Sequence, residues 1–447
     1  MYLRLERGYG VCVDTRLEQS SGVLYKIDLQ DFFLLTLFNS NFSDSQISEI
    51  INRANYGDAL SDSEVFEYIV QKYSDILETS EFSGKRKSII LENSYLDFPI
   101  ESGLENKLSY PLMASIRITN YCDNRCIYCF NHSNQTSANY LDYKDISIVA
   151  DQLKLGGVST INITGGDPLC HPDIYAVLKL LVSYGFFLGL STKRLLDDAN
   201  VKQLCECGIK RIQISIDSND DSINERLIHR QQYYHRQKNS IQYLVARGIE
   251  VNVNSVVTAI NVDTIVPMLH DLDSVGVKNL FLTPYLSVSE TIDKILMPSP
   301  KQIEQLIDNL SQVHLQNILR EFAVPEQDET FSFFNGEHRM CTGGRMSIVI
   351  NHTGDVTVCE RLVDDPRFIV GNIKNSPIIE IWNSEAMKKL THPTQEYFVN
   401  TECENCDVFH KCITCDGVCY ARIVRATDRK YACDPFCVKS NRKIRFH

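Results

Sequence analysis

The stretch that decides the fold is ASIRITNYCDNRCIYC, residues 114–129. Apolar residues alternate over 114–119, which predicts a β-strand, and three cysteines follow it directly. Three thiolates this close in sequence can bind one metal centre, and thiolates suit zinc or iron–sulfur clusters. Structural zinc usually takes four protein ligands, whereas three leave one metal position open to a reactant. These residues therefore predict a reactive iron site at the end of a strand, with a chance spacing as the alternative.

Six strand–helix units follow one another from Ala114. The predicted helices lie between the strands and mostly end at a glycine, and a last helix is predicted over 301–319. Alternating strands and helices imply a parallel sheet with right-handed crossovers. Six units in roughly 200 residues are too few for an eight-stranded barrel, so the expected fold is α/β, a partial (β/α)6 TIM-like barrel. The predicted strands are 114–119, 158–164, 186–192, 211–217, 250–257 and 278–284.

The rest of the chain predicts two further domains. Residues 1–95 favour a winged-helix-like module, with β-prone runs at 2–6 and 23–27 and a capping box at Ser61 and Glu64 that opens a helix. Residues 96–110 are polar and irregular, which suggests a linker before the barrel over 111–325. Residues 326–447 show weak periodicity and hold nine of the sixteen cysteines, as expected of a domain stabilised by metal–sulfur bonds.

Composition excludes several classes of protein. A formal net charge of −12 argues against general nucleic-acid binding, which needs a basic face. The first ten residues hold no apolar core of a signal peptide, and no run approaches the 18 or so apolar residues of a membrane span. We therefore expect a cytoplasmic protein with no membrane partner, in which clustered cysteines bind metal rather than form disulfides.

The cysteine loop resembles a known signature. Cys122-x3-Cys126-x2-Cys129, with Tyr128 before the last cysteine, is similar to the motif of the radical S-adenosylmethionine (SAM) superfamily. The turn after the next strand, 164–168, reads Thr-Gly-Gly-Asp-Pro and resembles that superfamily's Gly-Gly-Glu-Pro motif. The resemblance implies a [4Fe–4S] cluster that chelates SAM, cleaves it after one-electron reduction and starts radical chemistry. A plain tight turn is the alternative for 164–168.

Further polar residues end the other strands, where ligands of parallel β/α folds bind. By resemblance, Ser215 would contact the SAM ribose and Arg230 the SAM carboxylate, while Asp217 is either a SAM contact or a helix cap. The family's usual Asn-Gly after the third strand is replaced by Lys193 and Arg194. The cofactor-binding residues implied are Tyr128, Gly165, Gly166, Asp167, Thr192, Ser215, Asp217 and Arg230.

The C-terminal cysteines resemble the SPASM domain of radical SAM maturases, which holds two auxiliary [4Fe–4S] clusters. The resemblance implies three clusters in all. It leaves Ser347 where some members have a further cysteine, so the proximal cluster would have an open position for a substrate thiol. A pair of zinc sites is the alternative. The implied ligands are Cys341, Cys359 and Cys419 for the proximal cluster and Cys403, Cys406, Cys412 or Cys415, and Cys437, with Cys433 an alternative to Cys437, for the distal cluster.

The same resemblance suggests a peptide substrate. A SPASM domain usually accompanies peptide or protein modification, and the N-terminal segment is similar in element order to modules that bind the leader of a precursor peptide. We expect a maturase that installs a thioether cross-link, served by an electron donor of the flavodoxin or ferredoxin type. Glu360 is a candidate base, with a solvated surface carboxylate as the alternative.

Three other functions stay open at this stage. The first is carbon–carbon cross-linking or epimerisation of the peptide. The second is formylglycine-type maturation of a protein. The third is non-catalytic: a zinc-bound scaffold or an electron carrier, which would not bind SAM.

Overall fold

The computed structural model describes residues 2–6, 9–13, 24–27, 107–130, 138–285, 290–313, 319–322, 341–435 and 437. It divides into two units, 1–101 with 155–159, and 102–154 with 160–447. The first unit contains a three-stranded antiparallel sheet of β1 (Tyr2–Glu6), β2 (Tyr9–Val13) and β3 (Leu24–Ile27). The strands predicted at 2–6 and 23–27 are thus present, and the predicted helices of the winged-helix-like module lie outside the described residues.

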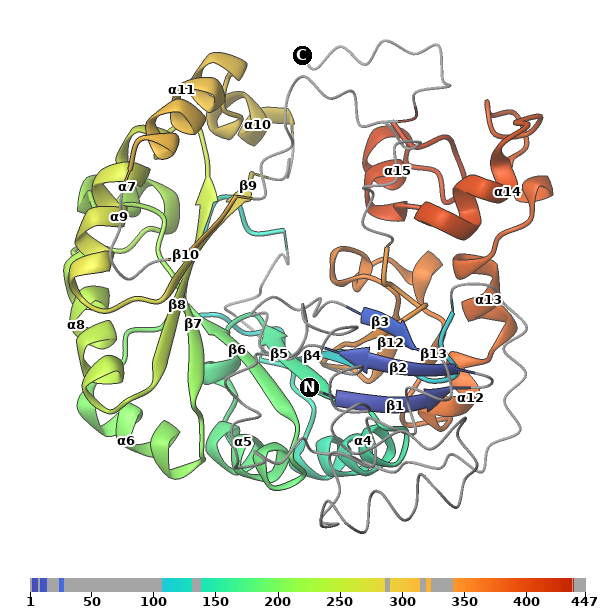
Figure 1. Ribbon diagram of the computed structural model, residues 1–447, viewed down its shortest axis with the longest axis horizontal. Coiled ribbons are helices and arrows are strands. Elements are labelled where there is room, and N and C mark those ends of the chain that lie inside the picture. Colours follow the sequence, from blue (N-terminus) through green and yellow to red (C-terminus); the bar gives the residue numbers. More distant parts are fainter. Residues whose placement is uncertain are drawn as a thin grey trace, which may run out of the picture. The chain divides into compact units, whose positions relative to one another are not determined.

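The second unit is organised by a sheet whose central six strands are parallel and follow chain order (Figure 1). Each strand lies within two residues of its predicted bounds, because alternating or continuous apolar runs between glycines fix strand positions locally. The predicted α/β fold with a parallel sheet is confirmed. These strands are β4 (Met113–Thr119), β5 (Thr160–Gly165), β6 (Phe187–Thr192), β7 (Arg211–Ser215), β8 (Glu250–Val257) and β9 (Asn279–Pro284).

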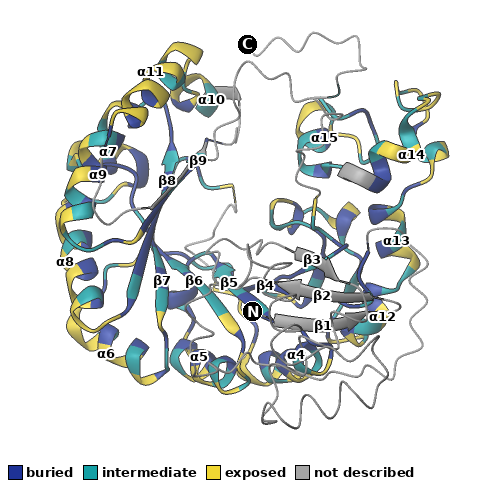
Figure 2. Ribbon diagram, in the orientation of Figure 1, coloured by how far each residue is buried: buried dark blue, intermediate teal, exposed yellow. Residues whose placement is uncertain are grey.

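Helices cover the outer face of this sheet, with buried residues toward the strands and exposed residues on the far side (Figures 1 and 2). Such an apolar stripe is what a helix packed on a sheet requires. The helices are α4 (Tyr143–Leu155), α5 (Ile174–Ser183), α6 (Asp198–Glu206), α7 (Asp221–Ile228), α8 (Tyr233–Ala246), α9 (Ile265–Ser274), α10 (Glu290–Leu296) and α11 (Pro300–Ser311).

Two helix predictions need correction. The single helix expected between 217 and 248 is two helices, α7 and α8, because His229 adopts a left-handed conformation with φ 55° and ends α7. The helix expected over 301–319 begins as predicted: Ser299 is the N-cap and forms a capping box with Gln302, and Pro300 is the first helical residue. It ends at Ser311, however, and a short strand, β10 (Leu319–Phe322), follows.

The sheet extends beyond the six predicted strands at both edges. β10 pairs with β9 in parallel. At the other edge, β11 (Ser347–Ile350) pairs with β4 in parallel and continues into the antiparallel strands β12 (Asp355–Thr357) and β13 (Gly371–Asn372). The cysteine-rich segment therefore begins as a continuation of the barrel sheet, which the sequence did not predict.

The C-terminal segment then forms short helices around an aromatic core. They are α12 (Ile378–Trp382), α13 (Glu385–Thr391), α14 (Phe409–Lys411) and α15 (Tyr420–Thr427). Trp382 is fully buried, and its Nε1 donates a hydrogen bond of 2.9 Å to the carbonyl of Leu108. Lys107, placed in the linker by sequence, is buried too, and its Nζ donates to the carbonyl of Trp382 at 3.1 Å.

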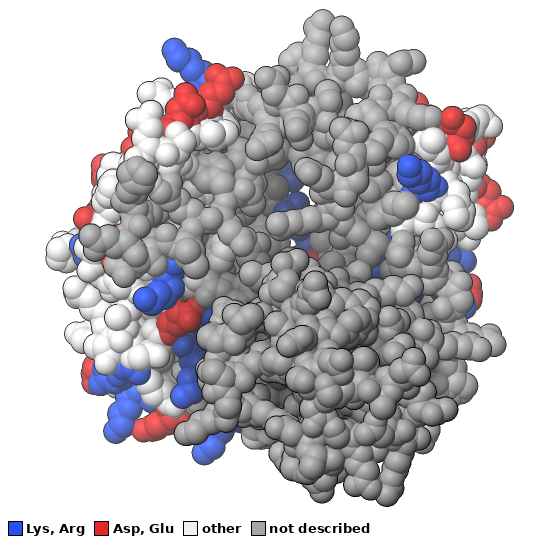
Figure 3. All heavy atoms as spheres, in the orientation of Figure 1, with Lys and Arg blue, Asp and Glu red and all other residues white. Residues whose placement is uncertain are grey.

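On the coloured part of the face in Figure 3, Lys and Arg side chains gather near the lower left edge, with Asp and Glu side chains among them. Among the helices of the described residues, none combines the length and apolar character needed to cross a membrane.

Candidate cluster and cofactor site

The cysteine loop is tied to the end of the neighbouring strand by backbone contacts. The Gly166 N–H donates to the carbonyl of Thr119 at 2.8 Å, and the Asp167 N–H donates to the carbonyl of Tyr121 at 2.9 Å. A Cβ at Gly165 would lie 2.5 Å from the Thr119 oxygen, and one at Gly166 would lie 2.1 Å from the Tyr121 oxygen. Only glycine fits such an approach, so the Gly-Gly pair sets the distance between the two loops.

Asp167 joins the ends of β5 and β6. Its carboxylate is buried and accepts hydrogen bonds from the Thr192 hydroxyl at 2.8 Å, the Lys193 N–H at 2.9 Å and the Leu169 N–H at 3.1 Å. Burial raises its pKa above the ordinary value, while these donors act in the opposite direction. Asp167 and Thr192 are thus brought together as predicted, and the hydrogen bonds hold the turn that was expected to meet SAM.

The three loop cysteines lie in a compact turn in which the Cys129 N–H donates to the carbonyl of Cys126 at 3.1 Å. Burial raises the pKa of Cys122 to about 12 and that of Cys126 to about 12. A buried thiolate needs a compensating positive charge, which bound iron supplies. The Lys193 ammonium acts in the same sense on Cys126.

Across the described part of the chain, no three Cys, His, Asp or Glu side chains converge tightly enough to hold a single metal ion. A cluster places a different demand on its ligands, because each thiolate binds a different iron atom and the sulfurs need not meet at one point. Three thiols on one short loop, that of Cys122 buried and those of Cys126 and Cys129 partly buried, lie beside a turn that admits only glycine. They therefore fit the [4Fe–4S] group that the signature implies.

Asp217 is fully buried and holds two neighbouring side chains. Its Oδ2 accepts a hydrogen bond from the Tyr128 hydroxyl and lies 3.0 Å from Lys193 Nζ, while its Oδ1 accepts from the Val256 N–H at 3.0 Å. Burial, with Asp217 second, raises the pKa of Tyr128 well above its ordinary value, so the phenol stays protonated. Asp217 was expected as a SAM contact or a helix cap; here its oxygens bind side chains and backbone of the protein, and it caps no helix.

Arg230 lies beside the cysteine loop. Its Nη2 donates to the carbonyl of Asp123 at 2.7 Å and forms an ion pair with the Asp123 carboxylate at 3.1 Å. Both side chains are about one third exposed. A guanidinium held next to Cys122 suits recognition of a carboxylate, the role expected for Arg230.

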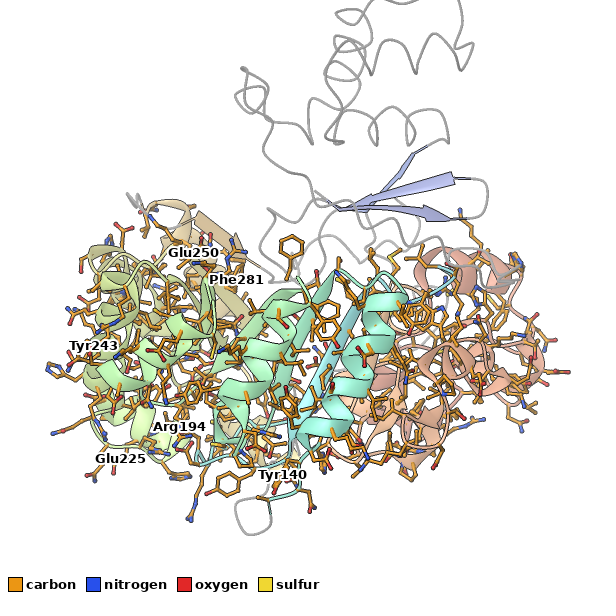
Figure 4. All side chains as sticks on the ribbon, turned by 90° about the horizontal axis from the view of Figure 1, so that it is seen from below. Tyr140, Arg194, Glu225, Tyr243, Glu250 and Phe281 are labelled. Atoms are coloured by element: carbon orange, nitrogen blue, oxygen red, sulfur yellow. The ribbon has the colours of Figure 1, made fainter. Side chains whose placement is uncertain are left out.

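Ser215 ends β7, and its carbonyl accepts a hydrogen bond of 2.8 Å from the Tyr233 hydroxyl. Figure 4 shows Tyr140, Arg194 and Glu225 at the edge of the sheet where the strands end, with Glu250, which begins β8, at the opposite edge. Thr192 and Ser215 are the last residues of β6 and β7, and the carboxyl ends of parallel strands lie at one edge of a sheet.

A second cysteine group lies in the C-terminal segment. The charges of Cys341, Cys359 and Cys419 act on one another, and burial raises the pKa of Cys359 to about 11. Burial also raises the pKa of Cys341, while the guanidinium groups of Arg345 and Arg422 oppose that shift. The three cysteines predicted as one ligand set therefore influence one another electrostatically, and two guanidinium groups act on Cys341.

A third group of cysteines lies further along the C-terminal segment. Cys433 is hydrogen-bonded through its thiol to Cys403 and Cys437, and the Cys403 contact raises the pKa of Cys433 to about 12. The Cys406 N–H donates to the carbonyl of Cys403. Cys412 opens the turn Cys412–Asp416, whereas the side chain of Cys415 lies outside the described residues. Of the two alternatives for the last ligand, Cys433 therefore contacts Cys403 directly, and Cys437 contacts Cys433.

Sequence reasoning missed the side chains that support these sites. Lys193 was noted only as a departure from the family, although a lysine directly after a buried strand end is a signal that could have been followed. Arg345 is 1% exposed, and its guanidinium donates to the carbonyls of Thr391 at 2.8 Å and Thr414 at 3.0 Å, and to that of Ile413. No local pattern marks an arginine that holds carbonyls from distant segments.

Comparison with known proteins agrees with this geometry. The model of the radical SAM superfamily matches residues 116–274, and that of the SPASM iron–sulfur cluster-binding domain matches residues 341–407. An AdoMet-dependent heme synthase of Oleidesulfovibrio alaskensis is 23% identical, covering 73% of this chain and 87% of that protein. A PqqA peptide cyclase of Methylocella silvestris is 22% identical, covering 74% and 88%.

Among solved structures, Streptococcus suis SuiB bound to its precursor peptide SuiA is similar over nearly the whole of both chains. The TM-score is 0.69, with 19% sequence identity and 98% of each chain covered. This likeness concerns the fold alone.

Proposed function

We propose that this chain, which belongs to the radical SAM superfamily, reductively cleaves SAM and uses the resulting radical to modify a ribosomally made precursor peptide. The observation that carries the proposal is the pairing of β11 with β4. It joins the domain that contains the C-terminal cysteines directly to the strand that precedes the cysteine loop. The precursor peptide bound to SuiB and the peptide named in PqqA peptide cyclase support a peptide as substrate.

Cys122, Cys126 and Cys129 would hold the SAM-binding [4Fe–4S] cluster. When bound, that cluster supplies one electron to SAM and so releases a 5′-deoxyadenosyl radical that takes a hydrogen atom from the substrate. The protein's own part is to bind and orient SAM. The Gly165–Gly166 backbone gives close access to it, and Arg230 offers a guanidinium for its carboxylate.

The C-terminal domain would hold two auxiliary clusters. Cys341, Cys359 and Cys419 form the proximal ligand set, and the Ser347 hydroxyl is engaged with the Thr342 hydroxyl at 3.1 Å, which disfavours it as a fourth ligand. An open position beside two guanidinium groups would favour a substrate thiolate. We infer a thioether as the product on this basis. The distal ligands would be Cys403, Cys406, Cys412 or Cys415, and Cys437.

Each segment of the chain would have its own role in this proposal. Residues 1–95 would bind the leader of the precursor, residues 96–110 would link this module to the barrel over 111–325, and residues 326–447 would form the auxiliary cluster domain. An external donor of the flavodoxin or ferredoxin type would supply the electron.

Metal analysis and SAM cleavage test the enzyme class. Anaerobically purified protein should contain about twelve iron atoms per chain, four for each cluster, and should form 5′-deoxyadenosine after reduction with SAM present. Cys126→Ala should abolish cleavage. Zinc in place of iron, with no cleavage after reconstitution, would support the scaffold alternative instead.

Mass spectrometry of the peptide product tests the bond formed. A short precursor encoded beside this gene is the substrate to use. A thioether and a carbon–carbon bond both remove two hydrogen atoms, but only the thioether protects one cysteine from alkylation. Epimerisation leaves the mass unchanged. Glu360, which follows Cys359 and opens a short 3-10 helix, is the candidate base, and an unchanged rate in Glu360→Gln would remove it from the mechanism.

A further inference from the structure

The Lys193 side chain is largely removed from solvent beside the cysteine loop, where an unpaired ammonium would be unfavourable. Its side chain is 12% exposed, and its Nζ lies 3.0 Å from Asp217 Oδ2 and 5.4 Å from the centre of the Tyr128 ring. Removing an ammonium from water is unfavourable unless it is paired. The pairing with Asp217 provides this, and it also fixes where the positive charge lies.

Hydrogen bonds fix the position of Asp217 independently of Lys193. Its Oδ1 accepts from the Val256 N–H at 3.0 Å, and the Tyr128 hydroxyl donates to Oδ2. The Asn261 side-chain amide donates to the Asp217 carbonyl at 2.5 Å and to the Val256 carbonyl at 2.9 Å. Because these hydrogen bonds hold both the carboxylate and the backbone carbonyl of Asp217, the carboxylate keeps the Lys193 ammonium in one position.

Contacts place the positive charge of Lys193 beside the cysteine loop. Its Nζ lies 5.4 Å from the centre of the Tyr128 ring, and Tyr128 directly precedes Cys129. Asp217 Oδ2 joins the two side chains, because it pairs with Lys193 and accepts a hydrogen bond from the Tyr128 hydroxyl. The ammonium is therefore held next to the loop whose thiols would bind iron.

We propose that Lys193 raises the reduction potential of the iron–sulfur cluster held by Cys122, Cys126 and Cys129, and that Asp217 moderates this effect. The inference rests on the proposed function. One electron from an external reductant adds one negative charge to the cluster, and a fixed cation in a water-poor site stabilises that charge. Burial and neighbouring charges are recognised controls of cluster potentials.

The test compares three variants of the full, iron-loaded protein. Lys193→Met removes the cation, Asp217→Asn removes the opposing anion, and Lys202→Met is the control, since Lys202 lies on α6 with its side chain 69% exposed. Each is titrated anaerobically with dithionite under electron paramagnetic resonance. The signal to follow is the one whose shape changes when SAM is added, because that signal reports the SAM-binding cluster.

We expect Lys193→Met to lower the equilibrium constant for reduction at least tenfold, which is a downward shift of about 59 mV for a one-electron couple. Asp217→Asn should shift the potential upward, and Lys202→Met should leave it unchanged. Lys193→Arg, which keeps the charge, should restore most of the native potential. Opposite shifts from two touching residues are a signature that a purely structural role would not produce.

Unmoved potentials in both site variants, or shifts in the same direction, would overturn the inference. If Lys193→Met fails to fold or to retain iron, the sign of the Asp217→Asn shift decides. A native protein with no SAM-responsive signal would overturn the proposed function, and this inference with it. A native signal with unmoved potentials overturns the inference alone.

Discussion

Gly166→Ala is the substitution whose effect the structure specifies most closely. The added Cβ would lie 2.1 Å from the Tyr121 oxygen, 2.4 Å from the Tyr121 carbonyl carbon and 2.8 Å from the Asn120 oxygen. Unstrained contacts between carbon atoms are about 3.5–4.0 Å, so the Tyr121 peptide must move by about 1 Å or more. All three atoms belong to the backbone, and no side-chain rotation can relieve the clash.

The clash falls on the residue that precedes Cys122. Overpacking of this kind costs about 1–3 kcal/mol of stability. A displacement of about 1 Å at a reacting site can lower the rate by about 10²-fold. We therefore expect SAM cleavage per bound iron to fall by about two orders of magnitude in Gly166→Ala, with a smaller loss of stability. The assay is 5′-deoxyadenosine formation by chromatography, normalised to iron content, with thermal unfolding recorded in parallel.

Gly248→Ala is the matched control. Gly248 has φ 73°, and a Cβ there would meet nothing within 4 Å. The left-handed conformation alone should cost about 1–2 kcal/mol. Cleavage per iron should stay unchanged, because Gly248 lies just before the amino end of β8, whereas ligands of parallel sheets bind at the carboxyl ends of the strands. Native cleavage and full iron in Gly166→Ala, or an equal loss of cleavage in both variants, would refute the reasoning.

Three further outcomes follow from the buried contacts. Thr192→Val removes the hydroxyl that donates to Asp167 and that accepts from the Arg194 N–H at 2.9 Å. Chemical denaturation should show a free energy of unfolding lower by about 1–3 kcal/mol, and a denaturation midpoint equal to that of the native protein would contradict this. Arg345→Met leaves three buried carbonyls without their guanidinium donor, so the free energy of unfolding should fall by about 3 kcal/mol. Iron content should fall too, while the paramagnetic resonance signal that responds to SAM persists. Cys437→Ala should lose about four iron atoms per chain and Cys433→Ala should keep them; the reverse pattern would make Cys433 the ligand.

The positions of the six central strands could be predicted from the sequence. The six central strands lie where apolar periodicity and closing glycines place them, since both signals are local. The spacing of Cys122, Cys126 and Cys129 predicted the family, which the match over residues 116–274 confirms. Here the chemistry of the ligands and the separation of residues along the chain carry the information, and neither depends on tertiary contacts.

Other features depended on the assembled fold. His229 ends α7 in a left-handed conformation without being glycine, so no pattern separated α7 from α8. β11 pairs with β4 across more than 200 residues of chain, and a short strand at a sheet edge is stabilised by its partner rather than by its own periodicity.

Sequence alone determined which residues are candidates for the chemistry: three clustered thiols, a Gly-Gly-Asp-Pro turn and a cysteine-rich C-terminal segment. Tertiary structure decided what surrounds them. Tyr128, Lys193 and Asp217 follow three different strands and meet only because parallel strands end at the same edge of the sheet. A buried charge acquires its effect from neighbours that burial brings close and water does not screen, and that environment exists only once the chain has folded.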